Sequence, residues 1–116
     1  MTVLRIIPNL TAPDPAALGR FWAEVLGLAP VMDHGWIVTL AGGAQTAQLS
    51  RAAEGGAGTP VPAVSIEVDD LDACHARALA AGGTVTHGPV AEDWGVRRFF
   101  LRDPAGKLLN ILAHDD

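Results

Sequence analysis

Polar side chains interrupt several hydrophobic stretches of this sequence, each at a position that alternates with apolar neighbours. These residues are Asn9, Gln48, Ser65, Glu67, Arg98 and Asn110. Successive side chains of a β-strand point to opposite faces, so we expect the polar residues to lie opposite the apolar ones. On such a face Glu67 could act as a general base, and Arg98 could stabilise an enolate. Amides and hydroxyls can instead bind a polar ligand, or they can bond one another across the sheet.

The stretch from Trp94 to His114 is predicted to be a β-hairpin. Apolar runs flank Asp103-Pro104-Ala105-Gly106, a pattern typical of a type I turn closed by a glycine bulge. In that register Arg98 faces Leu112 and Phe100 faces Asn110; without the bulge, Arg97 joins Phe99 instead. One face is then wholly apolar and should pack under a helix; it carries Phe99, Leu101, Leu109 and Ile111. The other face is typical of a cavity wall; it carries Arg98, Phe100, Leu108, Asn110, Leu112 and His114.

Two tryptophans are candidates for contact with a flat ligand. Trp94 precedes the hairpin and Trp36 opens an earlier strand; each could stack on a ligand, pack in the core or lie in a dimer contact. The histidines His34, His87 and His114 have no assigned role. An alternative metal set can be drawn from the loops, although its spacing matches no metal motif; it comprises His34, His87, Glu92 and Asp93.

The first half of the chain is predicted to form a strand, a helix and three further strands. The first strand, over residues 2–10, contains Pro8, which we expect to restrict it to a sheet edge or a bulge. Asp14 caps a helix that ends at Gly27. The apolar stripe of this helix consists of Leu18, Phe21, Trp22 and Val25. Short strands follow over residues 28–32, 36–41 and 45–50, and residues 51–61, rich in Ala, Gly and Pro, are predicted to be a linker.

The second half repeats this order. A strand over residues 63–68 precedes a helix that Asp70 caps and that Gly82 and Gly83 stop, and strands follow over 84–87, 96–102 and 107–114. The stripe of this helix consists of Leu71, Cys74, Ala78 and Leu79. The chain is therefore predicted to contain tandem βαβββ modules of about fifty residues, 1–50 and 62–116. One strand with one helical cover cannot close a core, so the modules must join their sheets in a single α+β domain, residues 1–116.

Composition narrows the classes of function. Of 116 residues, 49% are hydrophobic and 18% are charged, which excludes a disordered chain. The formal net charge of −5 argues against a nucleic-acid partner and favours a cationic ligand. The single cysteine gives no disulfide and no CxxC pair. No apolar run reaches membrane-spanning length and no leader is recognisable, so we expect a cytoplasmic protein without membrane contact.

Three motifs connect the chain to a known superfamily. They are residues 14–28, ending Phe21-Trp22-Ala23-Glu24-Val25-Leu26-Gly27-Leu28, then Val68-Asp69-Asp70-Leu71-Asp72, and Phe99-Phe100-Leu101-Arg102-Asp103-Pro104-Ala105-Gly106. With them, nearly the whole chain resembles the vicinal oxygen chelate superfamily, which contains glyoxalase I, extradiol dioxygenases, fosfomycin-resistance enzymes and bleomycin-binding proteins. The resemblance implies a mixed sheet that curls around a cavity, with the helices on the outer face, in a molecule that is often a homodimer.

The resemblance also implies a metal held by His, Gln or Glu on four strands. The matching positions here are Ile7, Gln48, Ala63 and Asn110. Isoleucine and alanine side chains offer no donor atom, and neutral amides leave the charge of a divalent metal largely uncompensated. Because some members use glutamine, a metal at Gln48 stays open. We expect this chain to have no metal site and no cofactor.

Three functions stay open at this point. The first is a metal-free protein that binds a small, partly aromatic molecule, as bleomycin-resistance proteins do. The residues expected to bind that ligand are Asn9, Trp36, Gln48, Ser65, Trp94, Arg98, Phe100 and Asn110. The second is a lyase, isomerase or dioxygenase that uses a divalent metal at a non-standard site, or Glu67 as base with Arg98. The third is a structural or regulatory module with an empty cleft.

Overall fold

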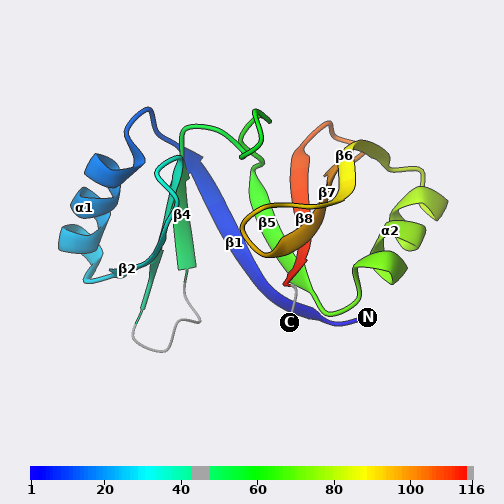
Figure 1. Cartoon of the computed structure of the whole chain (residues 1–116), viewed down its shortest axis with the longest axis horizontal. Coiled ribbons are helices and arrows are strands. Elements are labelled where there is room, and N and C mark those ends of the chain that lie inside the picture. The colour runs from blue at the N-terminus through cyan, green and yellow to red at the C-terminus, as the bar shows by residue number, and fades with distance from the viewer. Residues whose placement is uncertain (43–47, 115–116) are drawn as a thin grey trace. The chain divides into compact units, whose positions relative to one another are not determined.

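The computed structural model describes residues 1–42 and 48–114, apart from the side chain of Trp22. The chain folds as β1 (Val3–Thr11), α1 (Pro15–Leu26), β2 (Ala29–Asp33), β3 (Ile37–Ala41), β4 (Gln48–Ala52), β5 (Val64–Val68), α2 (Leu71–Ala80), β6 (Thr84–Ala91), β7 (Val96–Arg102) and β8 (Leu108–His114) (Figure 1). This order confirms the α+β class and the tandem βαβββ modules. No helix in the described ranges is long and apolar enough to cross a membrane.

The chain divides into two compact units, which are described separately. The first unit comprises residues 7–61, and the second comprises residues 1–6 with 62–116. Strand β1 contributes its end to the first unit and its start to the second. The hydrogen-bonded strand order is β2-β3-β4-β1 in the first unit and β1-β5-β8-β7-β6 in the second.

Pro8 was predicted to restrict β1 to a sheet edge or a bulge, and the edge alternative is wrong. Strand β1 lies between β4 and β5 in the strand order. Its parallel ladder with β4 begins at Asn9, one residue beyond the proline. A proline can lie in an interior strand here because the ladder with β4 does not include its missing N–H.

The second unit contains the predicted hairpin in the predicted register. Phe100 pairs with Asn110 and Arg98 with Leu112. The turn is closed by Gly106 N–H, which donates to the Asp103 carbonyl at 2.9 Å, and Gly106 has a φ of +82°. Strand β6 was predicted to end at His87 but continues to Ala91, through irregularities in its pairing with β7.

The core of the second unit lies between its sheet and α2. Val68, Leu71, Phe99 and Ile111 form a buried cluster, and Leu101 and Leu109 pack against it. Cys74 and Ala78 of the predicted stripe also pack there, and burial raises the pKa of the Cys74 thiol. Leu79 is exposed, so the predicted stripe of α2 is wrong at that position.

The predicted stripe of α1 is wrong at every described position. Leu18, Phe21 and Val25 are 37%, 57% and 58% exposed, and the side chain of Trp22 lies outside the described residues. The helix instead turns Gly19 and its small neighbours toward β3. A Cβ at Gly19 would lie 3.2 Å from Val38 Cγ1. The helix backbone therefore comes close to the strand at Gly19, where a methyl group would require a small shift of Val38.

The ends of the helices follow the sequence signals. Asp14 Oδ1 accepts a hydrogen bond from Ala17 N at 3.2 Å, and Gly27 ends α1 in the left-handed conformation. Asp70 caps α2 in the same way through Ala73 N. The predicted linker overlaps β4 by Arg51 and Ala52, and residues 45–47 of the strand predicted before it lie outside the described residues.

Candidate functional site

An amide and a hydroxyl occupy the middle of the second unit's sheet, on the face opposite α2. Ser65 of β5 and Asn110 of β8 are register partners in a parallel pair. The Asn110 Nδ2 donates to Ser65 Oγ at 3.1 Å, and each residue is 9% exposed. The other carboxamide atom, Asn110 Oδ1, is buried and accepts no hydrogen bond from any described residue. A buried acceptor without a donor is unusual and indicates a water or ligand contact.

A carboxylate lies on the same face, one side-chain repeat along β5. Glu67 Oε1 accepts from Arg5 Nε at 2.7 Å, and Glu67 Oε2 contacts His114 Nδ1. The three residues come from β5, β1 and β8. Sequence analysis did not assign Arg5, although it alternates with Leu4 and Ile6. Because both oxygens of Glu67 have cationic or N–H partners, a substrate would have to displace one of them before Glu67 could act as a base.

Arg98 is not the partner of Glu67. Its guanidinium is 2% exposed and pairs with Glu92, with Nε 2.7 Å from Oε2. It also lies over the rings of Trp94 at 4.9 Å and Phe100 at 4.6 Å. Burial lowers the pKa of Arg98, and the hydrogen bond and charge of Glu92 oppose that shift. These contacts of the guanidinium fix the loop that precedes β7.

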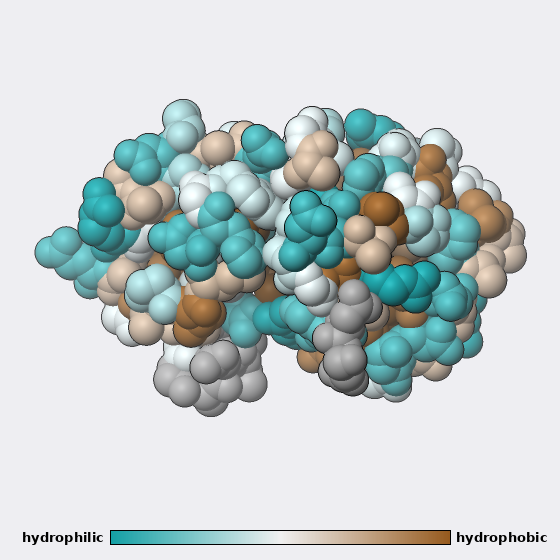
Figure 2. All heavy atoms as spheres, viewed as in Figure 1, coloured by the Kyte–Doolittle hydropathy of each residue, from teal (hydrophilic) through white to brown (hydrophobic). Residues whose placement is uncertain are grey.

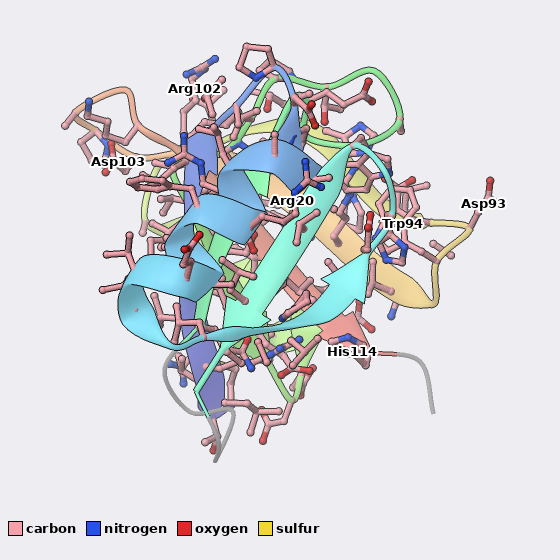
Figure 3. All side chains as sticks on the ribbon, turned by 90° about the vertical axis from the view of Figure 1, so that its left-hand side faces the viewer. Arg20, Asp93, Trp94, Arg102, Asp103 and His114 are labelled. Carbon is pink, nitrogen blue, oxygen red and sulfur yellow. The ribbon has the colours of Figure 1, made fainter. Side chains whose placement is uncertain are left out.

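The loop between β6 and β7 keeps its groups close to the sheet. His87 Nε2 lies 3.3 Å from the same Glu92 oxygen that binds Arg98. Asp93 is exposed and points away from the molecule, whereas Trp94 turns inward (Figure 3). In the alternative metal set drawn from these loops, Glu92 is therefore already paired with Arg98, and Asp93 is exposed to solvent. In the described part of the chain, no group of three or more His, Cys, Asp or Glu side chains could hold a metal ion.

The first unit has its own buried polar group on the face opposite α1. Asn9 of β1 pairs in register with Ser50 of β4, and Ser50 pairs with Thr39 of β3. The Thr39 and Ser50 hydroxyls are 2.7 Å apart and all three residues are buried. Gln48 lies two residues before Ser50, on the same face and half-buried. Sequence analysis did not select Thr39 and Ser50, although strand alternation with Val38 and Leu49 places them there.

Trp36 lies outside that polar group. Its ring stacks on His34, with centroids 6.0 Å apart and planes 26° apart. Both residues belong to the turn between β2 and β3 and its exit. Trp36 therefore has an aromatic neighbour that sequence analysis did not assign to it.

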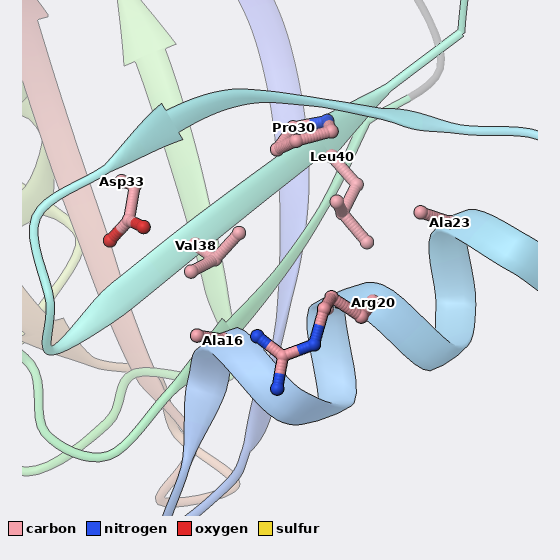
Figure 4. Close-up of a pocket in the computed structure, with 8 residues that line it drawn as sticks. Ala16, Arg20, Ala23, Pro30, Asp33, Val38 and Leu40 are labelled. Atoms are coloured by element: carbon pink, nitrogen blue, oxygen red, sulfur yellow. The ribbon is translucent and has the colours of Figure 1, made fainter.

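A hollow of about 250 Å³ lies on the other side of the first unit's sheet, between α1, β2 and β3. It is lined mainly by apolar side chains, with Arg20 and Asp33 at its rim (Figure 4). Ala16, Gly19 and Ala23 form its helical wall. The hollow exists because small residues face β3 while the larger ones of α1 are exposed.

The residues at the expected metal positions do not fit a divalent ion. Ile7 is buried hydrocarbon and Ala63 is exposed, and neither has a donor atom. Asn110 already donates to Ser65. A set with hydrocarbon at two of its four positions supplies at most two neutral amide oxygens, which compensate little of the charge of a divalent ion.

Comparison with known proteins places this arrangement in a family. Residues 6–112 match the model of the glyoxalase-like domain family. The sequences of curated proteins give no match.

Solved structures with the same fold are similar over nearly the whole chain. An NAD-dependent benzaldehyde dehydrogenase from Legionella pneumophila is 16% identical, with a TM-score of 0.76 over 95% of this chain and 99% of that one. A glyoxalase/bleomycin resistance protein/dioxygenase superfamily member from Vibrio splendidus 12B01 is 20% identical, with a TM-score of 0.66 over 97% and 99%.

A third similar structure contains a ligand. It is a variant of methylmalonyl-CoA epimerase from Streptomyces coelicolor in complex with 2-nitronate-propionyl-CoA, 18% identical, with a TM-score of 0.69 over 99% of this chain and 100% of that one. At these identities the likenesses show the fold alone.

Proposed function

The chain belongs to the glyoxalase-like domain family, and we propose that it is a metal-free member that binds a small, partly aromatic organic molecule, with a preference for cationic groups. Its role is then sequestration or resistance. The observation that supports this most is the chemistry of the buried strand faces. They carry amides and hydroxyls, including Asn110, Ser65 and Asn9, where a metal enzyme needs charged ligands.

The charge balance supports the preference for cations. The chain carries a formal charge of −5, and Glu67 lies on the face that presents the Asn110 carboxamide. An acidic surface raises the local concentration of cationic ligands and lowers that of anions. Trp36 and Gln48 of the first unit and Trp94 and Phe100 of the second are further ligand-binding residues that we propose; Arg98, whose guanidinium is held by Glu92, would act by positioning Trp94.

A thermal-shift screen tests this proposal. Cationic aromatic drugs, aromatic amines and matched carboxylates are each added in excess to the purified protein. A specific ligand at about 100 times its dissociation constant stabilises the folded state by about 2.7 kcal/mol, which is a shift of several degrees. A protein indifferent to every compound would contradict the proposal and favour a structural module with an empty cleft.

The second candidate is a lyase, isomerase or dioxygenase with a metal at a non-standard site. Glu67 favours it, because this carboxylate is only 15% exposed and lies beside Arg5 and His114. Groups of that kind can move a proton next to a carbonyl. Elemental analysis of protein purified without chelators distinguishes the two candidates, since the enzyme would retain a stoichiometric metal.

We also propose that the protein is a cytoplasmic homodimer and that α1 lies in its interface. The exposed residues Leu18, Phe21 and Val25 form a stripe at helical spacing. Arg20 and Glu24 flank this stripe, so two copies of α1 packed antiparallel can pair opposite charges. Figure 2 shows hydrophobic residues scattered among hydrophilic ones on one face of the molecule.

Light scattering after size exclusion measures the oligomeric state. Phe21→Glu should convert the dimer to a monomer, because it would bury an unpaired charge in the interface. The matched control is Leu79→Glu, which alters an equally exposed leucine on α2 and should leave the dimer intact. A dimer that survives Phe21→Glu would contradict the assignment of α1.

A further inference from the structure

Only one of the two polar atoms of the Asn110 carboxamide has a hydrogen-bond partner among the described residues. Its Nδ2 donates to Ser65 Oγ at 3.1 Å, which fixes the plane of the amide. Its Oδ1 is buried and has no donor among the described residues. An acceptor removed from water without a new partner destabilises the folded protein. A residue of this kind is best explained by a molecule that supplies the missing donor.

The groups around Asn110 favour a molecule that donates a hydrogen bond over an anionic one. Leu108 precedes and Leu112 follows Asn110 on the same face of β8, and both are buried hydrocarbon. Glu67 follows Ser65 on the same face of β5. The neighbourhood thus offers a vacant acceptor and a nearby carboxylate, while the cations Arg5 and Arg98 are held by Glu67 and Glu92. A ligand carboxylate would find no vacant donor there among these groups.

We infer that Asn110 Oδ1 accepts a hydrogen bond from an N–H or O–H group of the bound molecule, so that the ligand class is aryl or alkyl amines, amidines and amides rather than carboxylates. This inference rests on the proposed function and specifies which polar group of the ligand is recognised. Asn110 is then a binding residue through its oxygen, and Ser65 is a positioning residue that holds the amide.

The first unit contains a pair of buried hydroxyls that is closed within the sheet. Its register partners Thr39 and Ser50, on neighbouring strands, satisfy each other at 2.7 Å. A buried polar pair can therefore be closed within this sheet. At Asn110 and Ser65 the hydrogen bond leaves Asn110 Oδ1 without a donor among the described residues.

The test uses matched probes and variants of the full chain. Benzylamine and benzoate have similar size and opposite hydrogen-bonding character, and their dissociation constants are measured by titration calorimetry. Asn110→Asp keeps the size of the side chain and offers only acceptors, so it should bind benzylamine about tenfold more tightly. Asn110→Leu should abolish benzylamine binding, because it removes the acceptor; since it also removes the hydrogen bond to Ser65, the melting temperature is measured alongside to confirm that the variant is folded. Thr84→Asp adds the same charge at an exposed strand position and serves as the control.

The outcomes of these experiments distinguish the inference about Asn110 from the proposed ligand-binding function. Benzylamine binding that is lost in Asn110→Leu and strengthened in Asn110→Asp, but not in Thr84→Asp, supports the inference. Binding of benzoate in preference to benzylamine would overturn it and leave the binding function standing, since the amide would then present its N–H. Benzylamine binding that persists unchanged in a folded Asn110→Leu variant would also overturn it, because the ligand would then not depend on the Asn110 oxygen. A wild-type protein that binds neither these probes nor any compound of the wider screen contradicts the proposed function itself.

Discussion

Helix α2 places Leu71 in a buried cluster with Val68, Phe99 and Ile111, whereas helix α1 turns small residues toward its strands and leaves its large ones exposed. The two helices occupy the same place in their βαβββ modules. One packs as a core helix, and the other leaves a hollow beneath it and an apolar stripe outside. The same module order therefore gives two outcomes: the helix of the second unit covers a buried core, and the helix of the first leaves an exposed hydrophobic face, which we propose that a second copy covers.

The largest expected effect comes from the core of the second unit. Phe99→Ala should lower the free energy of unfolding by about 3–5 kcal/mol, because Phe99 is fully buried and its removal leaves a cavity. Phe21→Ala in α1 should cost less than about 1 kcal/mol in a protein diluted to monomers, because that ring is more than half exposed. Urea denaturation followed by circular dichroism measures both values. Equal losses would show that Phe21 contributes as much to stability as the buried Phe99.

The buried ion pair of the second unit is expected to have the next largest effect. Glu92→Gln should cost about 2–3 kcal/mol, since it leaves the buried guanidinium of Arg98 without a counter-charge. Glu24→Gln alters an exposed carboxylate on α1 and should change the free energy of unfolding by less than about 0.5 kcal/mol. Tryptophan fluorescence should also change in Glu92→Gln, because Trp94 lies over Arg98. A Glu92→Gln variant as stable as the wild type would contradict the assigned pairing.

A smaller effect is expected where the first unit closes its own polar pair. Thr39→Val keeps the shape of the side chain and leaves the buried Ser50 hydroxyl without its partner. The loss should be about 1–2 kcal/mol in chemical denaturation. Val38→Thr makes the reverse change at the adjacent position on the other face, where it would place a hydroxyl against α1, and should be similarly costly. A Thr39→Val variant as stable as wild type would mean that the hydroxyl pair contributes nothing.

The smallest effects compare glycines of the two helices. Gly19→Ala should stabilise by about 0.5–1 kcal/mol, because glycine is unfavourable inside a helix and Val38, its close neighbour, borders the hollow and can shift. Gly83→Ala, just beyond α2, should destabilise, because its Cβ would lie 2.5 Å from Leu101 Cδ1 and 3.1 Å from the Ala78 carbonyl oxygen. Melting temperatures of the two variants should therefore move in opposite directions. A lower melting temperature in both variants would show that Val38 cannot make room for a methyl group on α1.

Local rules predicted the parts of the fold that local chemistry determines. The turn residues Asp103 to Gly106 set the hairpin register, and Asp14, Gly27 and Asp70 set the helix ends. The face of α1 was not predictable in this way. A helical wheel ranks Leu18, Phe21 and Val25 as the buried side, but the close approach at Gly19 depends on the tertiary position of Val38.

The sequence predicted which face of the sheet the candidate site residues occupy, but it did not predict which residues they contact. Strand alternation correctly placed Asn110, Ser65 and Glu67 on the side away from α2. It could not show that Arg5 and His114 would reach Glu67, because those contacts join residues from distant parts of the chain. Arg98 was predicted to stabilise an enolate while Glu67 acts as the base, but its guanidinium is already bound to Glu92.

The central claim is that this chain binds its ligand without a metal, and metal binding by the wild type and the Asn110→Glu variant tests it most directly. Both proteins, purified without chelators, are titrated with Zn²⁺ and Ni²⁺ in a calorimeter. We predict that the variant folds and that neither protein binds either ion tightly, because Ile7 and Ala63 still offer no donor atom. One tightly bound ion per chain, in the variant or in the wild type, would contradict the account.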